Sequence, residues 1–224
     1  MIQLSLAAIL WLAVHLGIAG TTLRRVIVTR IGVNGFRGIF SIASIAAIIW
    51  LVLSYNAAPT VQLWTAPAWL HWVLALVMLP AFVLFVASFV RNPTAAGGEK
   101  YLGQDITGIQ RITRHPMMVS YTIWAAVHCI GRGDVASLLF FGAFLITCVV
   151  GMPSVDIKTK ERDAAAWAQL SATTSIVPFM AILTRRNRLV FSEIGWLVPA
   201  IGLAIWVEML IFHQRIFGIA ALPV

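Results

Sequence analysis

Residues 38–90 decide the fold: GIFSIASIAAIIWLVLSYNAAPTVQLWTAPAWLHWVLALVMLPAFVLFVASFV contains no Asp, Glu, Lys or Arg. A membrane-spanning helix needs ~20 residues, so the stretch is too long for one span and suits two. Asn56, Pro59 and Pro67 interrupt it near the middle. Aromatic residues typical of a membrane–water boundary gather there: Tyr55, Trp64, Trp69 and Trp72. We predict two helices, because backbone amides in hydrocarbon need partners within their own segment.

The composition of the whole chain also indicates that the protein lies in a membrane. Hydrophobic residues make up 60% of the 224 residues and charged residues 11%, whereas soluble domains have about 45–50% and about 25%. Further apolar runs predict spans at the ranges 1–23, 115–130, 135–155 and 194–212. The run at 115–130 is short, and a partly re-entrant segment is an alternative. The predicted fold class is an all-α, polytopic transmembrane bundle of about six spans, forming a single domain over residues 1–224.

The charge distribution predicts how the chain is oriented. There are 16 Lys and Arg against 8 Asp and Glu, a formal charge of +8. Most basic residues lie in three hydrophilic segments, at 24–37, 91–114 and 158–188, which follow the first, third and fifth spans. Such segments are typical of cytoplasmic loops, which places both termini on the far side. The expected partner of the basic surface is the lipid bilayer, because no nucleic-acid motif accompanies the charge.

Five histidines are present, and three of them lie within or at the start of apolar runs: His15, His115 and His128. An ionisable residue inside a span is a functional candidate by default, and helix bundles hold haem between histidines on facing helices. The alternative for each is a hydrogen-bonded packing residue. No CxxC or CxxCH motif surrounds the two cysteines, so covalent c-type haem is excluded and haem b is not.

Spacing limits which histidines can share an iron. His115 and His128 are thirteen residues apart, roughly 20 Å along one helix, so they cannot both ligate one iron unless that helix is broken. His15 is the deep candidate on another helix, and spacing alone does not choose its partner. A second candidate site is a polar cluster of residues 111–116 and 158–163, which suits an anionic headgroup or a nucleotide-like cofactor. The alternative for that cluster is a pair of basic loops with local ion pairs.

Several motifs together resemble the NnrU family. They are GIQRITRHP at 108–116, WAAVH at 124–128, Gly133-Asp134, and AVHLG at 13–17. The resemblance covers most of the chain and implies a role in denitrification in the bacterial inner membrane. Our leading hypothesis is therefore a haem b-binding protein that serves nitrite and nitric oxide reduction in electron transfer, sensing or assembly. Its expected partners are components of the nitrite and nitric oxide reductases.

A related branch of that family, the zeta-carotene isomerases, implies an alternative. These are membrane haem b proteins that isomerise a cis double bond. Their two axial histidines look like His15 and His128, and their additional histidine looks like His115. Their cysteine three residues before the second axial histidine is replaced here by Ala125. The alternative function is a haem-dependent cis–trans isomerase of a carotenoid-like polyene, with His15 and His128 as the metal ligands.

The RHP segment is also similar to membrane isoprenylcysteine methyltransferases, which use S-adenosylmethionine. In those enzymes a Tyr-Gly pair and a double Glu follow the segment, whereas this chain has Met117-Met118-Val119-Ser120 and the single Glu161. Methyl transfer that depends on His115 and Glu161 is the second alternative.

Overall fold

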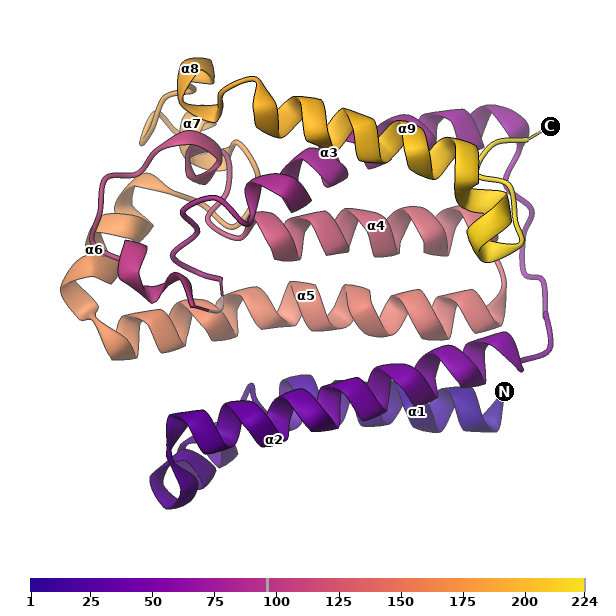
Figure 1. The fold of residues 1–224 in the computed structure, drawn as a ribbon, viewed down its shortest axis with the longest axis horizontal. Coiled ribbons are helices and arrows are strands. Elements are labelled where there is room, and N and C mark those ends of the chain that lie inside the picture. Colours follow the sequence, from indigo (N-terminus) through magenta and orange to yellow (C-terminus); the bar gives the residue numbers. More distant parts are fainter. Residues whose placement is uncertain (96, 224) are drawn as a thin grey trace. The chain divides into compact units, whose positions relative to one another are not determined.

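The computed structural model describes residues 1–95 and 97–223, and within these ranges the chain is helical with no β-strand. The prediction of an all-α fold is confirmed. The elements, labelled in Figure 1, are α1 (Ile2–Leu12), the π-helix η1 (Ala13–Ile18), α2 (Thr22–Asn56), α3 (Ala68–Ala87), the 3-10 helices η2 (Gly98–Tyr101) and η3 (Gly108–Arg111), α4 (Pro116–Arg132), α5 (Val135–Arg162), α6 (Ala164–Thr173), α7 (Met180–Leu183), α8 (Phe191–Ile194) and α9 (Leu197–Phe217).

Four helices in the described part of the chain are long and apolar enough to cross a membrane: α2, α3, α5 and α9. The apolar helix Ile2–Ile18 and the 17-residue α4 are shorter. These six helices match the six predicted spans in position, and four reach spanning length. α4 begins at Pro116, because a proline at the first helical position loses no hydrogen bond. A lipid bilayer is the environment that such apolar helices require.

The basic segment 24–37, which we predicted to be a loop, is mostly helical. α2 begins at Thr22, where the Thr21 hydroxyl accepts a hydrogen bond from the Leu23 amide at 3.3 Å. At Gly32 the backbone turns with φ 76°, which divides α2 into two pieces. Arginine has a good helix propensity, so a charged segment need not be a loop. A glycine at positive φ changes the chain's direction without a Cβ clash.

The chain divides into two compact units, which are described separately. Unit 1 comprises Met1–Ala66 and His128–Gly151, and unit 2 comprises Pro67–Val127 and Met152–Val224. Each unit therefore contains a part of α4 and a part of α5. The single domain over residues 1–224 stays a prediction.

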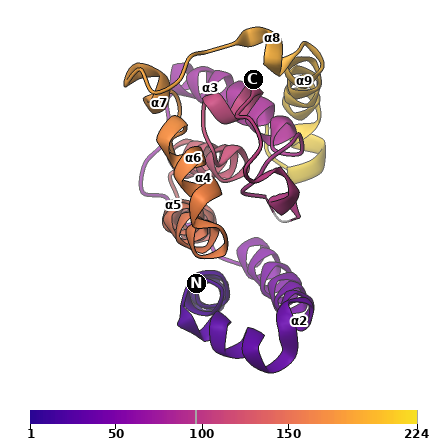
Figure 2. The ribbon, with the colours of Figure 1, turned by 90° about the vertical axis from the view of Figure 1, so that its left-hand side faces the viewer.

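In unit 1, α1 and α2 form an antiparallel pair, and both ribbon views show them side by side (Figures 1 and 2). The start of α1 meets the end of α2, since residues 1–4 and residues 54, 57, 58 and 59 line one open pocket. Ala7 of α1 and Ala47 of α2 are fully buried. Small residues let two membrane helices approach closely, which explains their place on the packed faces.

The connection between α4 and α5 is hydrogen-bonded to the segment that follows α2. The amides of Leu63 and Trp64 both donate to the carbonyl of Gly133, at 2.8 and 3.1 Å. Gly133 has φ 61°, and a Cβ there would lie 2.3 Å from the carbonyl oxygen of Trp64. Only glycine fits this turn, because both the dihedral angle and the close approach exclude a side chain.

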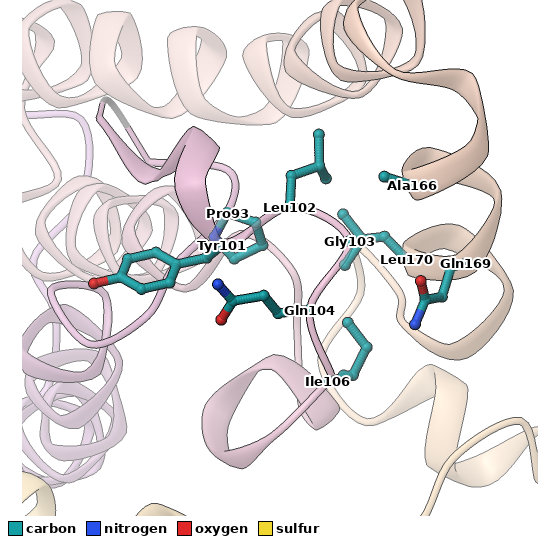
Figure 3. Close-up of a pocket in the computed structure, with 9 residues that line it drawn as sticks. All are labelled: Pro93, Tyr101, Leu102, Gly103, Gln104, Ile106, Ala166, Gln169 and Leu170. Carbon is teal, nitrogen blue, oxygen red and sulfur yellow. The ribbon is translucent and has the colours of Figure 1, made fainter.

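In unit 2, α3 packs against α9. The indole of Trp206 donates to the carbonyl of Ala75 at 2.7 Å, and a Cβ on Gly202 would lie 2.9 Å from the Cα of Val83. The loop after η2 packs on α6, where Leu102 and Gly103 face the helix (Figure 3). The pocket drawn in that figure has no room for a water molecule, so it is a packing contact and not a ligand site.

Candidate functional site

His15 lies in the π-helical turn η1 at the end of the first apolar helix. π-Turns inside α-helices are rare and occur frequently at functional sites. The Nδ1 of His15 lies 2.9 Å from the carbonyl oxygen of Trp11. A carbonyl only accepts, so Nδ1 carries the proton and Nε2 carries the lone pair. Histidines that ligate metals have this arrangement, with the second ring nitrogen donating to a carbonyl or carboxylate.

Aromatic rings surround the His15 imidazole within unit 1. Its ring stacks on Trp11 with the centroids 3.8 Å apart and meets the ring of Phe40 edge-on at 5.3 Å. Trp11 is held in turn by α5, because its indole donates to the Thr147 hydroxyl at 3.0 Å and its ring contacts Phe144 at 4.7 Å. The orientation of His15 is therefore fixed from two neighbouring helices.

His128, in the part of α4 that belongs to unit 1, lies at the other end of the same aromatic cluster. Its ring stacks on Phe141 at 4.6 Å. Phe141 contacts Phe140 at 5.0 Å, and Phe140 contacts Phe144 at 5.4 Å. A chain of four rings from Trp11 to Phe141 thus links the two histidines. We call these four rings, Trp11, Phe144, Phe140 and Phe141, the aromatic chain.

A polar network that the sequence did not predict adjoins the His128 end. Tyr55 stacks on Phe140 at 4.6 Å, and its hydroxyl is 2.9 Å from the hydroxyl of Ser137. Ser137 donates to Asp134 at 2.7 Å through its hydroxyl and at 2.8 Å through its amide. Asp134 is buried and is also 3.5 Å from Arg132. In the sequence, Asp134 stood out only as part of the Gly133-Asp134 motif, whereas its carboxylate accepts the hydrogen bonds at the start of α5.

His115 belongs to unit 2, in a second cluster. Its side chain is buried, and Nε2 donates to the carboxylate of Asp156 at 2.7 Å. Arg114 donates to the same carboxylate through Nε and Nη2 at 2.5–3.0 Å, and its guanidinium lies over the ring of Trp167 at 5.2 Å. Arg114 and His115, the first two residues of the RHP motif, therefore both donate to the carboxylate of Asp156. Sequence reasoning missed Asp156 because it comes directly after an apolar run and is 41 residues from His115.

Arg111, the first basic residue of the predicted polar cluster, binds Glu193 of α8. Its Nε and Nη2 donate to the two carboxylate oxygens at 2.6 and 2.8 Å, and the Gly108 amide adds a bond of 2.8 Å. These bonds, chiefly those from Arg111, hold the pKa of Glu193 at about 2, and that carboxylate raises the pKa of Arg111. This ion pair joins the end of η3 to α8.

The predicted ligands are thus divided between the units. His15 and His128 share the aromatic cluster of unit 1, and His115 lies in the acid-centred cluster of unit 2. In the part of the chain that the structure describes, no three His, Cys, Asp or Glu side chains gather as a metal site would require. A haem iron needs fewer protein ligands, because the porphyrin nitrogens supply the rest. The roles assigned to the three histidines stay predictions.

A family model described as "NnrU protein" matches residues 3–221 of the chain. Among curated proteins, the chain is similar to 15-cis-zeta-carotene isomerase, chloroplastic, of Zea mays, with 32% identity over 108 residues, covering 48% of this chain and 30% of the relative. The protein of the same name from Arabidopsis thaliana is 27% identical over 182 residues, covering 78% of this chain and 48% of the relative. The chain spans less than half the length of either relative. No solved structure is significantly similar.

Proposed function

Because the chain belongs to the NnrU family, as its RHP and WxxxH segments indicated, we propose that it is a membrane enzyme that isomerises a cis double bond of a carotenoid-like polyene. Both curated relatives are named as isomerases of zeta-carotene, which supports the isomerase alternative better than our leading hypothesis. The role in nitrite and nitric oxide reduction and its reductase partners stay predictions. So do the bacterial inner membrane and the orientation of the loops, since both relatives are chloroplastic by name.

The observation that carries this proposal is the aromatic chain between His15 and His128. A conjugated polyene is insoluble in water and dissolves in the bilayer, from which the apolar helices α1, α2 and α5 can receive it. Flat aromatic faces favour contact with an extended π-system. The rings of Trp11, Phe140, Phe141 and Phe144 offer such faces one after another within unit 1. Aromatic and aliphatic side chains there also exclude water from the reacting bond.

Haem b is the cofactor that the resemblance implies, and the side chains of unit 1 suit it chemically. His15 presents Nε2 as a lone pair, with the Nδ1–H bond to Trp11 fixing the ring. His128 supplies a second imidazole in apolar surroundings. Bound haem would supply an iron centre that lowers the bond order of the reacting double bond. Since the aromatic chain occupies the path between the histidines, a porphyrin held by both requires Trp11 or Phe141 to leave its stack.

An absorption spectrum tests the cofactor. The protein purified after expression with ample haem should show a Soret band that shifts on reduction. His15→Ala and His128→Ala should each change or abolish the band. His71→Ala and His213→Ala are matched controls, since both rings bond to backbone carbonyls at other places, and they should leave it unchanged. A wild-type protein without a Soret band contradicts the assignment of haem.

Turnover tests the reaction. The purified protein in liposomes that contain 15-cis-zeta-carotene should change the isomer composition measured by chromatography, and the two histidine variants should not. If the protein binds haem without isomerising the polyene, the proposed isomerase activity is refuted. The role in nitrogen-oxide respiration is then the better hypothesis. The S-adenosylmethionine alternative gains no support, because the His115 on which it depends is engaged by Asp156.

A further inference from the structure

Helix α9 lies beside α3 in unit 2, as both ribbon views show (Figures 1 and 2). Gly202 and Trp206 are on the side toward α3, because Gly202 approaches Val83 and the indole of Trp206 donates to Ala75. The structure describes every residue of α9, and among them only Gly202 is buried. The side of α9 that faces away from α3 is therefore uncovered within unit 2.

This uncovered side carries a carboxyl group, that of Glu208. Successive residues of a helix are turned by about 100°, so Glu208 points about 160° away from Trp206. Glu208 is exposed, and its carboxylate has no hydrogen-bond or ion-pair partner among the residues that the structure describes. Arg215 is on the same side but lies about 10 Å further along the axis, at the helix end. Ala204, which is exposed too, lies on this side one turn before Glu208.

The position of Glu208 along α9 places its carboxyl group within the hydrocarbon. The helix has 21 residues, and Glu208 is about 16 Å from its start and about 14 Å from its end. Helical side chains tilt toward the N-terminus, so Glu208 leans toward the middle of the span and away from the nearer helix end. An ionisable group at such a depth is costly unless another group bonds to it. The uncovered side of α9 therefore requires a polar partner.

We propose that this partner is a second copy of the chain. Two α9 helices pack in parallel about a two-fold axis along the membrane normal, and Glu208 of each copy bonds to Glu208 of the other. Two-fold symmetry brings the same residue of both copies together at the same depth. A protonated carboxyl is both a donor and an acceptor, so the two groups satisfy each other without a cation. Ala204 lets the two helices approach closely, because small residues favour contact between membrane helices.

Energy transfer between two pools of the full chain tests the dimer. The pools carry different fluorescent proteins at the C-terminus and are mixed in phosphatidylcholine vesicles, where dilution with lipid gives the dissociation constant. Glu208→Leu should weaken association roughly 5–30-fold, the size of one interhelical hydrogen bond. Glu208→Gln should associate like wild type, because an amide also donates and accepts. Gln214→Leu is the matched control, since this exposed polar residue is turned by about 120° from Glu208, and its effect should stay below about 2-fold.

Disulfide cross-linking tests which side of α9 meets the second copy. Ala204→Cys should give a covalent dimer on mild oxidation. Leu203→Cys, exposed but turned by about 100° from Ala204, should not. Wild type is the background control, because Cys129 and Cys148 are buried. Thermal unfolding of each variant checks that it is folded.

Three results would overturn the proposal, and none of them depends on haem or on the proposed reaction. The first is a wild type that stays monomeric in vesicles. The second is a dimer that is equally strong in wild type and Glu208→Leu. The third is cross-linking at Leu203→Cys that equals or exceeds the cross-linking at Ala204→Cys.

Discussion

Replacing Asp156 with alanine removes the one carboxylate that two buried donors share. Arg114 is 9% exposed and Asp156 is 7% exposed, so water cannot replace the lost partner easily. Three contacts from Arg114 and one from His115 end on this acid. The variant keeps the guanidinium charge and leaves it without its counter-ion. Desolvation of an unpaired charge then dominates the change in stability.

The expected loss is about 3–5 kcal/mol, the range found when one partner of a buried ion pair is deleted. For a chain of this length, 1 kcal/mol lowers the unfolding midpoint by roughly 2–4 °C, so the midpoint should fall by about 6–20 °C. Asp156→Asn should cost less, because the amide keeps one acceptor oxygen and nearly the same volume. Arg114→Met should recover part of the loss in the Asp156→Ala background, because no charge is then left unpaired.

The assay is thermal unfolding in detergent, followed by tryptophan fluorescence. Asp163→Ala is the matched control, since this exposed aspartate caps α6 through one hydrogen bond of 2.9 Å. That cap is worth about 0.5–2 kcal/mol. If Asp156→Ala and Asp163→Ala lower the midpoint equally, the Arg114–Asp156–His115 cluster is not buried as described. If Arg114→Met recovers nothing, the unpaired charge is not the cause.

The remaining predictions use other features of the fold. Glu193→Gln should lower the unfolding midpoint relative to wild type by an amount that is constant at neutral pH, declines as the pH falls below 4.5 and vanishes near 2. The reason is that the pKa of Glu193 is lowered from 4.5 to about 2 in the folded protein. A difference in midpoint that grows in acid contradicts this expectation. Gly133→Ala should cost several kcal/mol or prevent folding, because its Cβ would lie 2.3 Å from the Trp64 carbonyl oxygen, and expression with thermal unfolding measures it. Ser44→Ala should raise the midpoint of the ligand-free protein by a few degrees, because the buried Ser44 hydroxyl has no partner among the described residues, whereas exposed Ser41→Ala should not.

The helices were predictable because their cause is local. Long apolar runs without charge must be helical in a bilayer, and the Pro116 start of α4 follows from proline chemistry. The segment 24–37 was predicted wrongly, because charge was taken as a sign of a loop. Arginines are compatible with a helix, and the change of direction lies in the backbone of Gly32 alone.

The site was predictable only in its residue types. The histidines in apolar runs stood out because buried imidazoles are rare in membranes. The residues that bond to these side chains could not be recognised in the sequence, because they are far away along the chain. Asp156 is 41 residues from His115, and Thr147 is 136 residues from Trp11, whose indole donates to it. The π-turn around His15 has no signal in the sequence that we recognise. Contacts between distant segments depend on packing, which residue patterns do not encode locally.

The extra residue of the π-turn at Ala13–Ile18 has a consequence for insertions and deletions. Removing one residue there would leave an ordinary α-helical turn, and the helix before it would keep nearly the same orientation, because the π-turn holds its extra residue within about one turn. Trp11 would then stay beside Thr147. A deletion elsewhere in the first helix would instead rotate everything before it by about 100° about the helix axis and turn the indole of Trp11 away.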